Sequence, residues 1–280
     1  IMLFIGIYFG RQKLSQSEYH LGGHRLSGWA LALSERATGE SAWLILGLTG
    51  AAFSIGLAEV WVAIGCVTGV VFSWLFLARK FREEAATYEC ITYVDYFASK
   101  YKDHAQTIRW LASIVIIFFY TIYVYAQFEG GGKILHQTFK IDPTFGILVS
   151  ALITIVYSAA GGFMAVVWTD AVQSILMIIT FVLVPIIAFY HVCNQGLSIS
   201  LALESAGPEM NSWLGTQAGL EIGLLAAGLF ILNRLSWMFG YFGGQPPLST
   251  RWMAMKDDKE VKKGTYVALI WTILAYSGAI

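Results

Sequence analysis

The chain has 280 residues, of which 57% are hydrophobic and only 13% are charged, and its formal net charge at pH 7 is zero. Because soluble domains carry roughly 25% charged residues, this deficit predicts a polytopic membrane protein and excludes a large soluble core. The zero net charge argues against nucleic-acid binding, and the 3 cysteines have neither metal-ligand nor disulfide spacing. The sequence also contains no nucleophile–base arrangement and no metal cluster, so we expect neither an enzyme nor a bound cofactor.

The expected membrane spans follow from the apolar runs, since a helix needs about 20 apolar residues to cross the hydrocarbon core. Residues 1–10 resemble the end of a first helix whose beginning is missing. Seven spans follow, the last ending with the chain, at 29–56, 60–78, 110–128, 144–160, 171–190, 213–242 and 266–280. We expect Gly161 and Gly162 to separate the span at 144–160 from a short loop.

The lysines and arginines indicate how these spans are oriented. Fourteen of them fall in the first, third and seventh loops, on one side, whereas only Lys133 and Lys140 fall on the other side. Cytoplasmic loops of membrane proteins carry the excess of basic residues. We therefore expect the basic loops, with Arg251 in the seventh, to be cytoplasmic in a multi-pass protein of the cell (inner) membrane.

Two of the expected spans contain polar interruptions. The span at 29–56 is expected to break near residues 38–41, and the span at 213–242 carries Asn233, Arg234 and Ser236 before three glycines. Broken membrane helices occur only around a protein-lined cavity, and inverted-repeat transporters place them at equivalent positions of two halves. The two spans are five apart, which predicts five-helix repeats within a single transmembrane domain, 1–280. The first repeat covers about 28–192, and an incomplete second repeat covers about 213–280.

The interruptions also have plain structural interpretations. Small residues can be packing notches between helices. Glu40 lies four residues after Arg36, on the same helix face, and the two side chains can form an ion pair. Arg234 can pair with Glu221 or with Glu40 inside the membrane.

A run of small and polar residues at 157–173 lies between two apolar stretches and contains Gly161, Gly162, Trp168, Thr169 and Asp170. An acid at the start of a membrane span is costly and usually has a function, although Asp170 can also cap a helix that starts near Ala171. The run closely resembles the loop before the sixth helix of the sodium:solute symporter family, and within it the sodium/proline symporters. Further stretches resemble that family in the same order, at 19–23, 41–50, 58–65, 92–97, 119–123 and 237–246.

The resemblance implies an all-α fold of the leucine-transporter type, with five-plus-five inverted repeats, and a site for proline. Proline is a small zwitterion, so aromatic faces suit its ammonium and its ring, and helix N–H groups suit its carboxylate. The residues that match the family's substrate site are Ser41, Ala42, Trp43, Tyr123, Trp237, Tyr241 and Pro246.

The resemblance also implies a sodium site formed by the backbone carbonyls of Ala37 and Glu40, and a coupling role for Asp170. Hydroxyls from a later helix complete the family's sodium site, and that helix is absent from this chain. Sodium/proline symporters carry an aspartate at the position of Gly39, one residue before Glu40. Either Glu40 supplies the missing carboxylate from the adjacent position, or coupling differs in this chain.

These features predict a sodium-coupled secondary active transporter that imports proline or a similar small solute by alternating access. The expected partners are the sodium ion, the solute and the lipid bilayer. The chain looks truncated at both ends. The alternative is a membrane sensory domain of symporter type fused to a signalling module.

Overall fold

The computed structural model describes residues 1–12, 15–196, 198–215 and 223–280, and within these residues it contains helices and no strand. The first half of the chain forms α1 (Met2–Gly10), α2 (Gln16–Leu21), η1 (Gly22–His24), α3 (Gly28–Ala42), η2 (Trp43–Leu48), α4 (Thr49–Ile55), η3 (Gly56–Glu59), α5 (Val60–Phe72), η4 (Ser73–Leu77), α6 (Ala78–Thr87), α7 (Tyr93–Lys100), η5 (Lys102–His104) and α8 (Ala105–Phe139). The second half forms α9 (Pro143–Asn194), α10 (Ile199–Ala206), η6 (Pro208–Asn211), α11 (Leu224–Leu235), η8 (Ser236–Tyr241), α12 (Pro246–Met253) and α13 (Asp258–Ala279).

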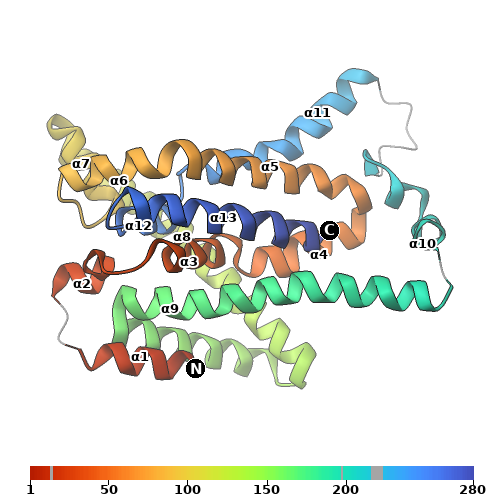
Figure 1. Ribbon diagram of the computed structural model, residues 1–280, viewed down its shortest axis with the longest axis horizontal. Helices are drawn as coiled ribbons and strands as arrows, with labels where there is room; N and C mark the ends of the chain where they lie inside the picture. The colour runs from red at the N-terminus through yellow and green to blue at the C-terminus, as the bar shows by residue number, and fades with distance from the viewer. Residues whose placement is uncertain (13–14, 197, 216–222) are drawn as a thin grey trace.

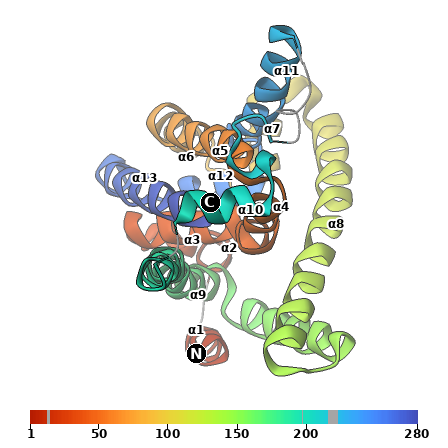
Figure 2. The same cartoon turned by 90° about the vertical axis from the view of Figure 1, so that its right-hand side faces the viewer.

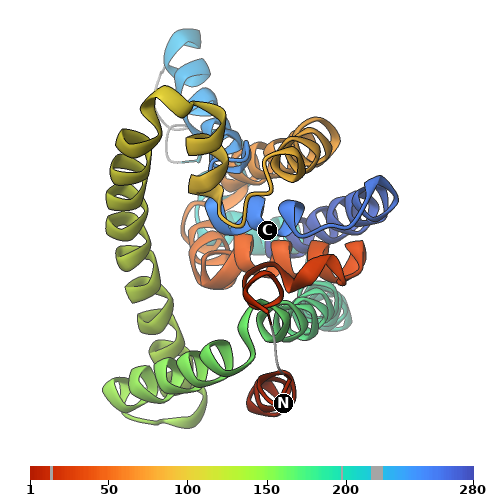
Figure 3. The same ribbon diagram turned by 90° about the vertical axis from the view of Figure 1, so that its left-hand side faces the viewer.

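The centre of the molecule is a bundle in which α3 and α5 pack on α13, and α3 and α13 pack on the second part of α9 (Figure 1). Its buried core includes Leu31, Val70, Trp74 and Trp271. The long helix α8 stands apart at one side of this bundle and joins α7 to α9 (Figures 2 and 3).

Four continuous helical stretches of the described residues are long and apolar enough to cross a membrane: Gly28–Thr87, Lys102–Phe139, Pro143–Asn194 and Leu224–Tyr241. The first and third contain 60 and 52 residues, so each is long enough for two crossings. The expected span at 266–280 is helical in α13 but is not one of these four stretches. Exposed apolar side chains on α8, such as Ile117 and Phe118, have the exposure that a lipid-facing helix requires. The protein is therefore an α-helical membrane protein, as its composition predicted.

The expected loop after Gly161 is not present. The helix α9 changes direction along its length (Figure 3). The turn falls at Gly162, where φ is 57° and ψ is −154°, and the helix resumes directly at Phe163. A Cβ atom on Gly162 would lie 2.7 Å from Cδ2 of Tyr19, so only glycine fits both the backbone conformation and the space. Because the helix already begins at Phe163, Asp170 lies inside it, and the interpretation of Asp170 as a helix cap is wrong.

The first expected helix interruption is confirmed as a break in the helical backbone, and the second is a change from α-helix to 3₁₀-helix before the helical stretch ends. The first falls at Ser41, whose φ of 44° and ψ of −152° interrupt the helical backbone before a π-helical segment, η2. In the second, α11 ends at Leu235 and a tight 3₁₀ segment leads to Gly243 at φ 77°. A non-glycine residue at positive φ costs of order 1–3 kcal/mol and persists where the surroundings impose it. The conformation of Ser41 therefore marks the first break as a candidate functional site.

Candidate functional site

The break at Ser41 leaves backbone groups that side chains of α8 take up. A regular helix would join the N–H of Ala42 to the carbonyl of Thr38. Instead the N–H of Ala42 donates to Oε1 of Gln127 at 3.1 Å, and the hydroxyl of Tyr123 donates to the carbonyl oxygen of Thr38 at 3.2 Å. The long helix α8 is therefore hydrogen-bonded to both sides of the break.

The two broken helices meet each other at an aromatic contact. The indole of Trp43, just after the first break, stacks on the indole of Trp237 with a centroid distance of 4.8 Å and an interplanar angle of 26°. One turn later, the hydroxyl of Tyr241 donates to Oε2 of Glu40 at 2.8 Å. The sequence predicted two interruptions, and the structure brings them into direct contact.

A cavity of about 730 Å³, here called cavity B, lies between α8 and the two broken helices. Its aromatic walls also include Tyr93, Phe119 and Tyr120. The residues of the expected substrate site that line cavity B are Ser41, Trp43, Tyr123, Trp237, Tyr241 and Pro246. The structure thus brings six of the seven expected substrate residues together.

A second cavity of about 890 Å³, cavity A, lies on the other side of the first break. Ala42, the seventh expected substrate residue, lines cavity A and not cavity B. Ala37 and Asp170, expected to bind sodium and to couple it, also line cavity A. Its walls include the oxygen-bearing side chains of Thr38, Ser41, Gln127, Ser150, Thr154 and Gln173. Ser41 and Tyr123 line both cavities, so the first break lies between them.

A third cavity of about 310 Å³, cavity C, lies on the opposite side of the stacked indoles, because Trp43 and Trp237 line both cavity C and cavity B. Arg234 and Glu59 line cavity C and form an ion pair there. The expectation that Arg234 pairs with Glu40 is therefore wrong, and Glu221, the other expected partner, lies outside the described residues.

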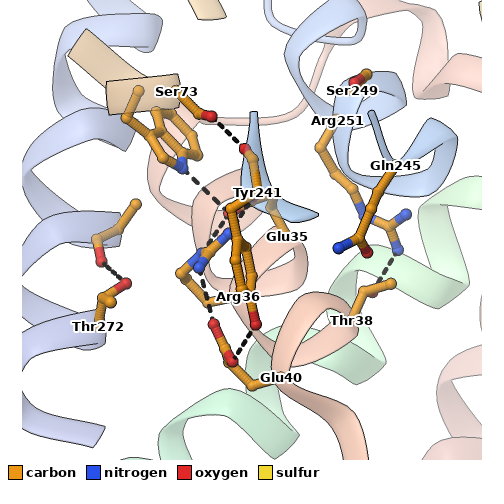
Figure 4. A network of polar contacts seen from close by, with 12 residues as sticks. Glu35, Arg36, Thr38, Glu40, Ser73, Tyr241, Gln245, Ser249, Arg251 and Thr272 are labelled. Atoms are coloured by element: carbon orange, nitrogen blue, oxygen red, sulfur yellow. Dashed lines mark hydrogen bonds and ion pairs between the residues drawn. The ribbon is translucent and has the colours of Figure 1, made fainter. Parts of the chain in front are cut away.

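The expected ion pair between Arg36 and Glu40 is confirmed inside the bundle (Figure 4). Arg36 donates to Oε1 of Glu40 at 2.9 Å and also pairs with Glu35, and all three side chains are at most 1% exposed. Glu35 accepts a further hydrogen bond from the indole N–H of Trp74 at 3.1 Å. Buried ionised groups are tolerated only when paired and hydrogen-bonded, and this cluster meets that condition.

Arg251 (Figure 4) lies in α12, where it is 6% exposed. It forms an ion pair with Oδ2 of Asp170 at 3.0 Å. Its guanidinium also donates to Ser34 at 3.0 Å and to Thr38 at 2.8 Å. Arg251, expected in the seventh loop, is thus a buried residue of the helix α12. Asp170 accepts from Ser34 at 2.6 Å as well, so this network joins α3, α9 and α12 beside cavity A.

Outside the membrane-spanning segments, a carboxylate fixes the start of the first broken helix. Glu260, in the first turn of α13, accepts the backbone N–H of Gly28 at 2.6 Å. Hydrogen bonds from Lys263 and from that N–H lower the pKa of Glu260 below its usual value, so the carboxylate is ionised at neutral pH. A negative charge at a helix N-terminus is favourable, and it holds α3 against α13.

The sequence interpretation missed several polar residues at these cavities. Gln127 and Gln245 line cavities A and B, and both are amides within or next to apolar segments, which is a signal that the sequence offers. Arg251 gave no such signal, because it stands in the sequence among the basic residues that follow the last broken helix.

An α-helical membrane bundle whose two broken helices meet beside large cavities has the architecture of a secondary transporter. A family model described as the sodium:solute symporter family matches residues 19–280. The chain therefore belongs to the sodium:solute symporter family, which confirms the resemblance seen in the sequence. Members of this family are transporters and not enzymes.

Three relatives are similar to this chain over its whole length. The high-affinity proline transporter PutP of Bacillus subtilis (strain 168) is 34% identical over 283 residues, covering 100% of this chain and 57% of that protein. The osmoregulated proline transporter OpuE of the same organism is 31% identical, covering 100% of this chain and 55% of its own length. Sodium/proline symporter 2 of Staphylococcus saprophyticus is 32% identical, with 100% and 53% coverage. The chain thus spans a little over half the length of these relatives.

A solved structure supports the fold. A Na⁺-coupled sialic acid symporter in a substrate-bound outward-open state matches with a TM-score of 0.71, covering 99% of this chain and 58% of that one, at 18% identity. At this identity the match shows the fold alone. It confirms the expected all-α membrane fold of the leucine-transporter type.

Proposed function

We propose that the protein is a sodium-coupled secondary active transporter that imports proline or a similar small solute by alternating access. The observation that carries this proposal is the contact between the two broken helices at the stacked indoles, with a cavity on either side. The names of the relatives favour proline as the solute and sodium as the coupled ion, and none of them favours a sensory domain.

The solute is proposed to bind in cavity B. Its walls are rich in aromatic rings, which attract an ammonium group and cover an apolar ring. Trp43, Trp237 and Tyr241 would enclose the ring of proline, while Ser41 and Tyr123 supply hydroxyls. The side chain of Ala42 borders cavity A and not cavity B, so any contribution of Ala42 to the solute site would come from its backbone.

Sodium is proposed to bind at the edge of cavity A, to the backbone carbonyl oxygens of Ala37 and Glu40. The carbonyl oxygen of Glu40 accepts the N–H of Trp43, and it retains a second lone pair for a cation. Asp170, 12% exposed at its side chain, brings a carboxylate to the same cavity. Because Ser41 borders both cavities, an ion that orders the break also shapes the solute site, and this coupling is reciprocal.

Alternating access is proposed to move the helices of the two repeats, about 28–192 and 213–280, around this break. The basic loops are proposed to face the cytoplasm. Cavity C would then lie on the external side of the stacked indoles, and cavity B, which extends to Tyr93 of α7, on the cytoplasmic side.

The test is uptake of radiolabelled proline by the intact protein in proteoliposomes, with an imposed inward sodium gradient. We expect uptake that is at least about tenfold faster with sodium than with choline outside, since each 1.4 kcal/mol of coupling corresponds to a factor of ten. Collapsing the gradient with a sodium ionophore is the control and removes concentrative uptake. Equal uptake in choline contradicts sodium coupling, and competition by another amino acid in preference to proline reassigns the solute.

A further inference from the structure

Glu40 has a carboxylate whose bonding capacity is largely used within the protein. Its side chain is fully buried, at 0% exposure. Oε1 accepts a hydrogen bond from Nη1 of Arg36 at 2.9 Å, and Oε2 accepts one from the hydroxyl of Tyr241 at 2.8 Å (Figure 4). Oε2 also accepts one from the hydroxyl of Tyr276 at 2.5 Å. A carboxylate offers about four acceptor positions, and three of them are occupied here.

The position of the carboxylate also separates it from the proposed ion site. Ala37 and Asp170 line cavity A, whereas the carboxylate of Glu40 is bonded to Arg36, Tyr241 and Tyr276 inside the bundle. Displacing any of its three donors by a cation would break a buried hydrogen bond to a carboxylate, at a cost of about 1–3 kcal/mol. The geometry therefore gives the side chain of Glu40 a role other than ligating sodium.

The hydroxyl of Tyr241 points to Glu40, while its ring forms part of the wall of cavity B. Tyr241 is only 5% exposed, and Arg36 lies over its ring at 5.7 Å. Tyr276, in α13, lines none of the three cavities and lies 3.1 Å from the Tyr241 hydroxyl. Glu40 thus ties one wall of the solute cavity to the first broken helix and to α13.

We propose that Glu40 is a positioning residue of the solute site, which holds the ring of Tyr241 in the wall of cavity B and does not ligate sodium through its side chain. This inference rests on the proposed function and deepens it. In this chain the carboxylate beside the first break serves solute recognition and leaves ion binding to other groups.

The first test measures the affinity for proline and the requirement for sodium separately, by uptake in proteoliposomes. Glu40→Gln removes the charge and one acceptor oxygen of the group that holds Tyr241, and Tyr276→Phe removes a hydroxyl that bonds to Tyr241. Neither variant alters a residue that lines the cavities. We expect each to raise the KM for proline by about tenfold, in proportion to the loss of a charge-assisted hydrogen bond, and to leave the sodium concentration for half-activation within about twofold. Glu35→Gln is the matched control, because Glu35 also pairs with Arg36 but contacts neither tyrosine, and its KM stays within about threefold of wild type. A tenfold rise in the sodium requirement of Glu40→Gln, with Tyr276→Phe unchanged, overturns the proposal.

A second readout does not depend on transport. Sodium and proline each raise the melting temperature of a protein that binds them in its folded state. For the purified intact protein in detergent, we expect Glu40→Gln to keep the rise caused by sodium chloride over choline chloride and to lose most of the rise caused by proline. Loss of the sodium-dependent rise with the proline-dependent rise intact contradicts the inference.

A double-mutant cycle decides the inference even if the wild-type protein transports no proline, an outcome that refutes the proposed function by itself. Glu40→Gln and Tyr241→Phe alter the two ends of one hydrogen bond, because glutamine lacks the charge and one acceptor oxygen and phenylalanine lacks the donor, so their effects on the melting temperature should be clearly less than additive. Glu35→Gln with Tyr241→Phe is the control pair and should be additive. Additive effects for Glu40→Gln with Tyr241→Phe overturn the positioning role, whether or not uptake is observed.

Discussion

At the scale of single residues, Trp43 and Trp237 carry the contact on which the proposed mechanism depends. Trp43 follows the break at Ser41, and Trp237 lies within the 3₁₀ segment that continues α11. Together the two indoles line cavity B on one side and cavity C on the other. A stacked aromatic pair contributes about 0.5–1.5 kcal/mol beyond the burial of its surface. That energy is small enough for the pair to separate when a solute passes between the cavities.

We predict that Trp237→Ala raises the KM for proline uptake by about tenfold or more, because it removes an aromatic wall of cavity B and the partner of Trp43. Trp61→Ala is the matched control: Trp61 contacts Trp213 and borders none of the three cavities, so its KM should stay within about twofold of wild type. Initial rates of uptake over a range of proline concentrations measure both. An unchanged KM for Trp237→Ala in well-expressed protein removes this residue from the solute site.

At the scale of elements, the fold depends on points where helices stop being regular. Ser41 and Gly162 interrupt α3 and α9 without a loop, and each redirects the chain within a stretch long enough for two spans. The break at Ser41 is also a hydrogen-bonding surface, because Tyr123 and Gln127 of α8 take up the groups it frees. In membranes such irregular backbone is tolerated only when protein groups satisfy it, and here α8 does so.

The turn at Gly162 should not tolerate a side chain. Gly162→Ala places a methyl group 2.7–2.8 Å from Tyr19 and imposes a positive φ on alanine, which costs of order 1–3 kcal/mol in strain alone. We expect the melting temperature in detergent to fall by about 5 °C or more. Gly228→Ala is the control, because a Cβ atom there meets nothing within 4 Å and its melting temperature should not fall. Equal melting temperatures for the two variants would show that the turn at Gly162 is not tightly packed.

At the scale of the whole molecule, three cavities surround the place where the broken helices meet, and buried ion pairs stand around them. Arg234 pairs with Glu59 at cavity C, and Arg251 pairs with Asp170 at cavity A. Breaking such a buried pair by removing one partner typically costs 3–5 kcal/mol, so these pairs fix how the helices dock. A transporter that rocks between states must either replace such ion pairs by new ones or move the paired helices together.

The proposed orientation gives a prediction that uses a native residue. Cys193, near the end of α9, is exposed, whereas Cys66 and Cys90 are buried. In the proposed orientation Cys193 lies on the external side, opposite the basic loops. We therefore expect a membrane-impermeant maleimide to label Cys193 on intact cells. In a Cys193→Ser background, Lys102→Cys on the basic side should be labelled only after the cells are permeabilised. The reverse pattern would invert the assigned topology.

How much the sequence predicted depended on how local each signal was. The spans, the interruptions and the grouping of residues such as Trp43 and Tyr123 could be predicted, because hydropathy, helix-breaking residues and family motifs are read within a few residues. The helical start at Phe163 could not be predicted, because a single glycine at an unusual φ replaces the loop that Gly161 and Gly162 were expected to begin. The burial of Arg251 could not be predicted, because a buried arginine and a solvated one have the same sequence signal.

By itself, the sequence determined that this is a helical membrane protein of the sodium:solute symporter family with two interrupted helices, since apolar length and backbone-breaking residues act locally. Only the tertiary structure decided that Glu40 bonds Tyr276, 236 residues away, that Arg234 pairs with Glu59, and that Arg251 pairs with Asp170. A buried charge must find a partner, but the identity of that partner depends on which helices pack together, and packing joins residues that are far apart in the chain.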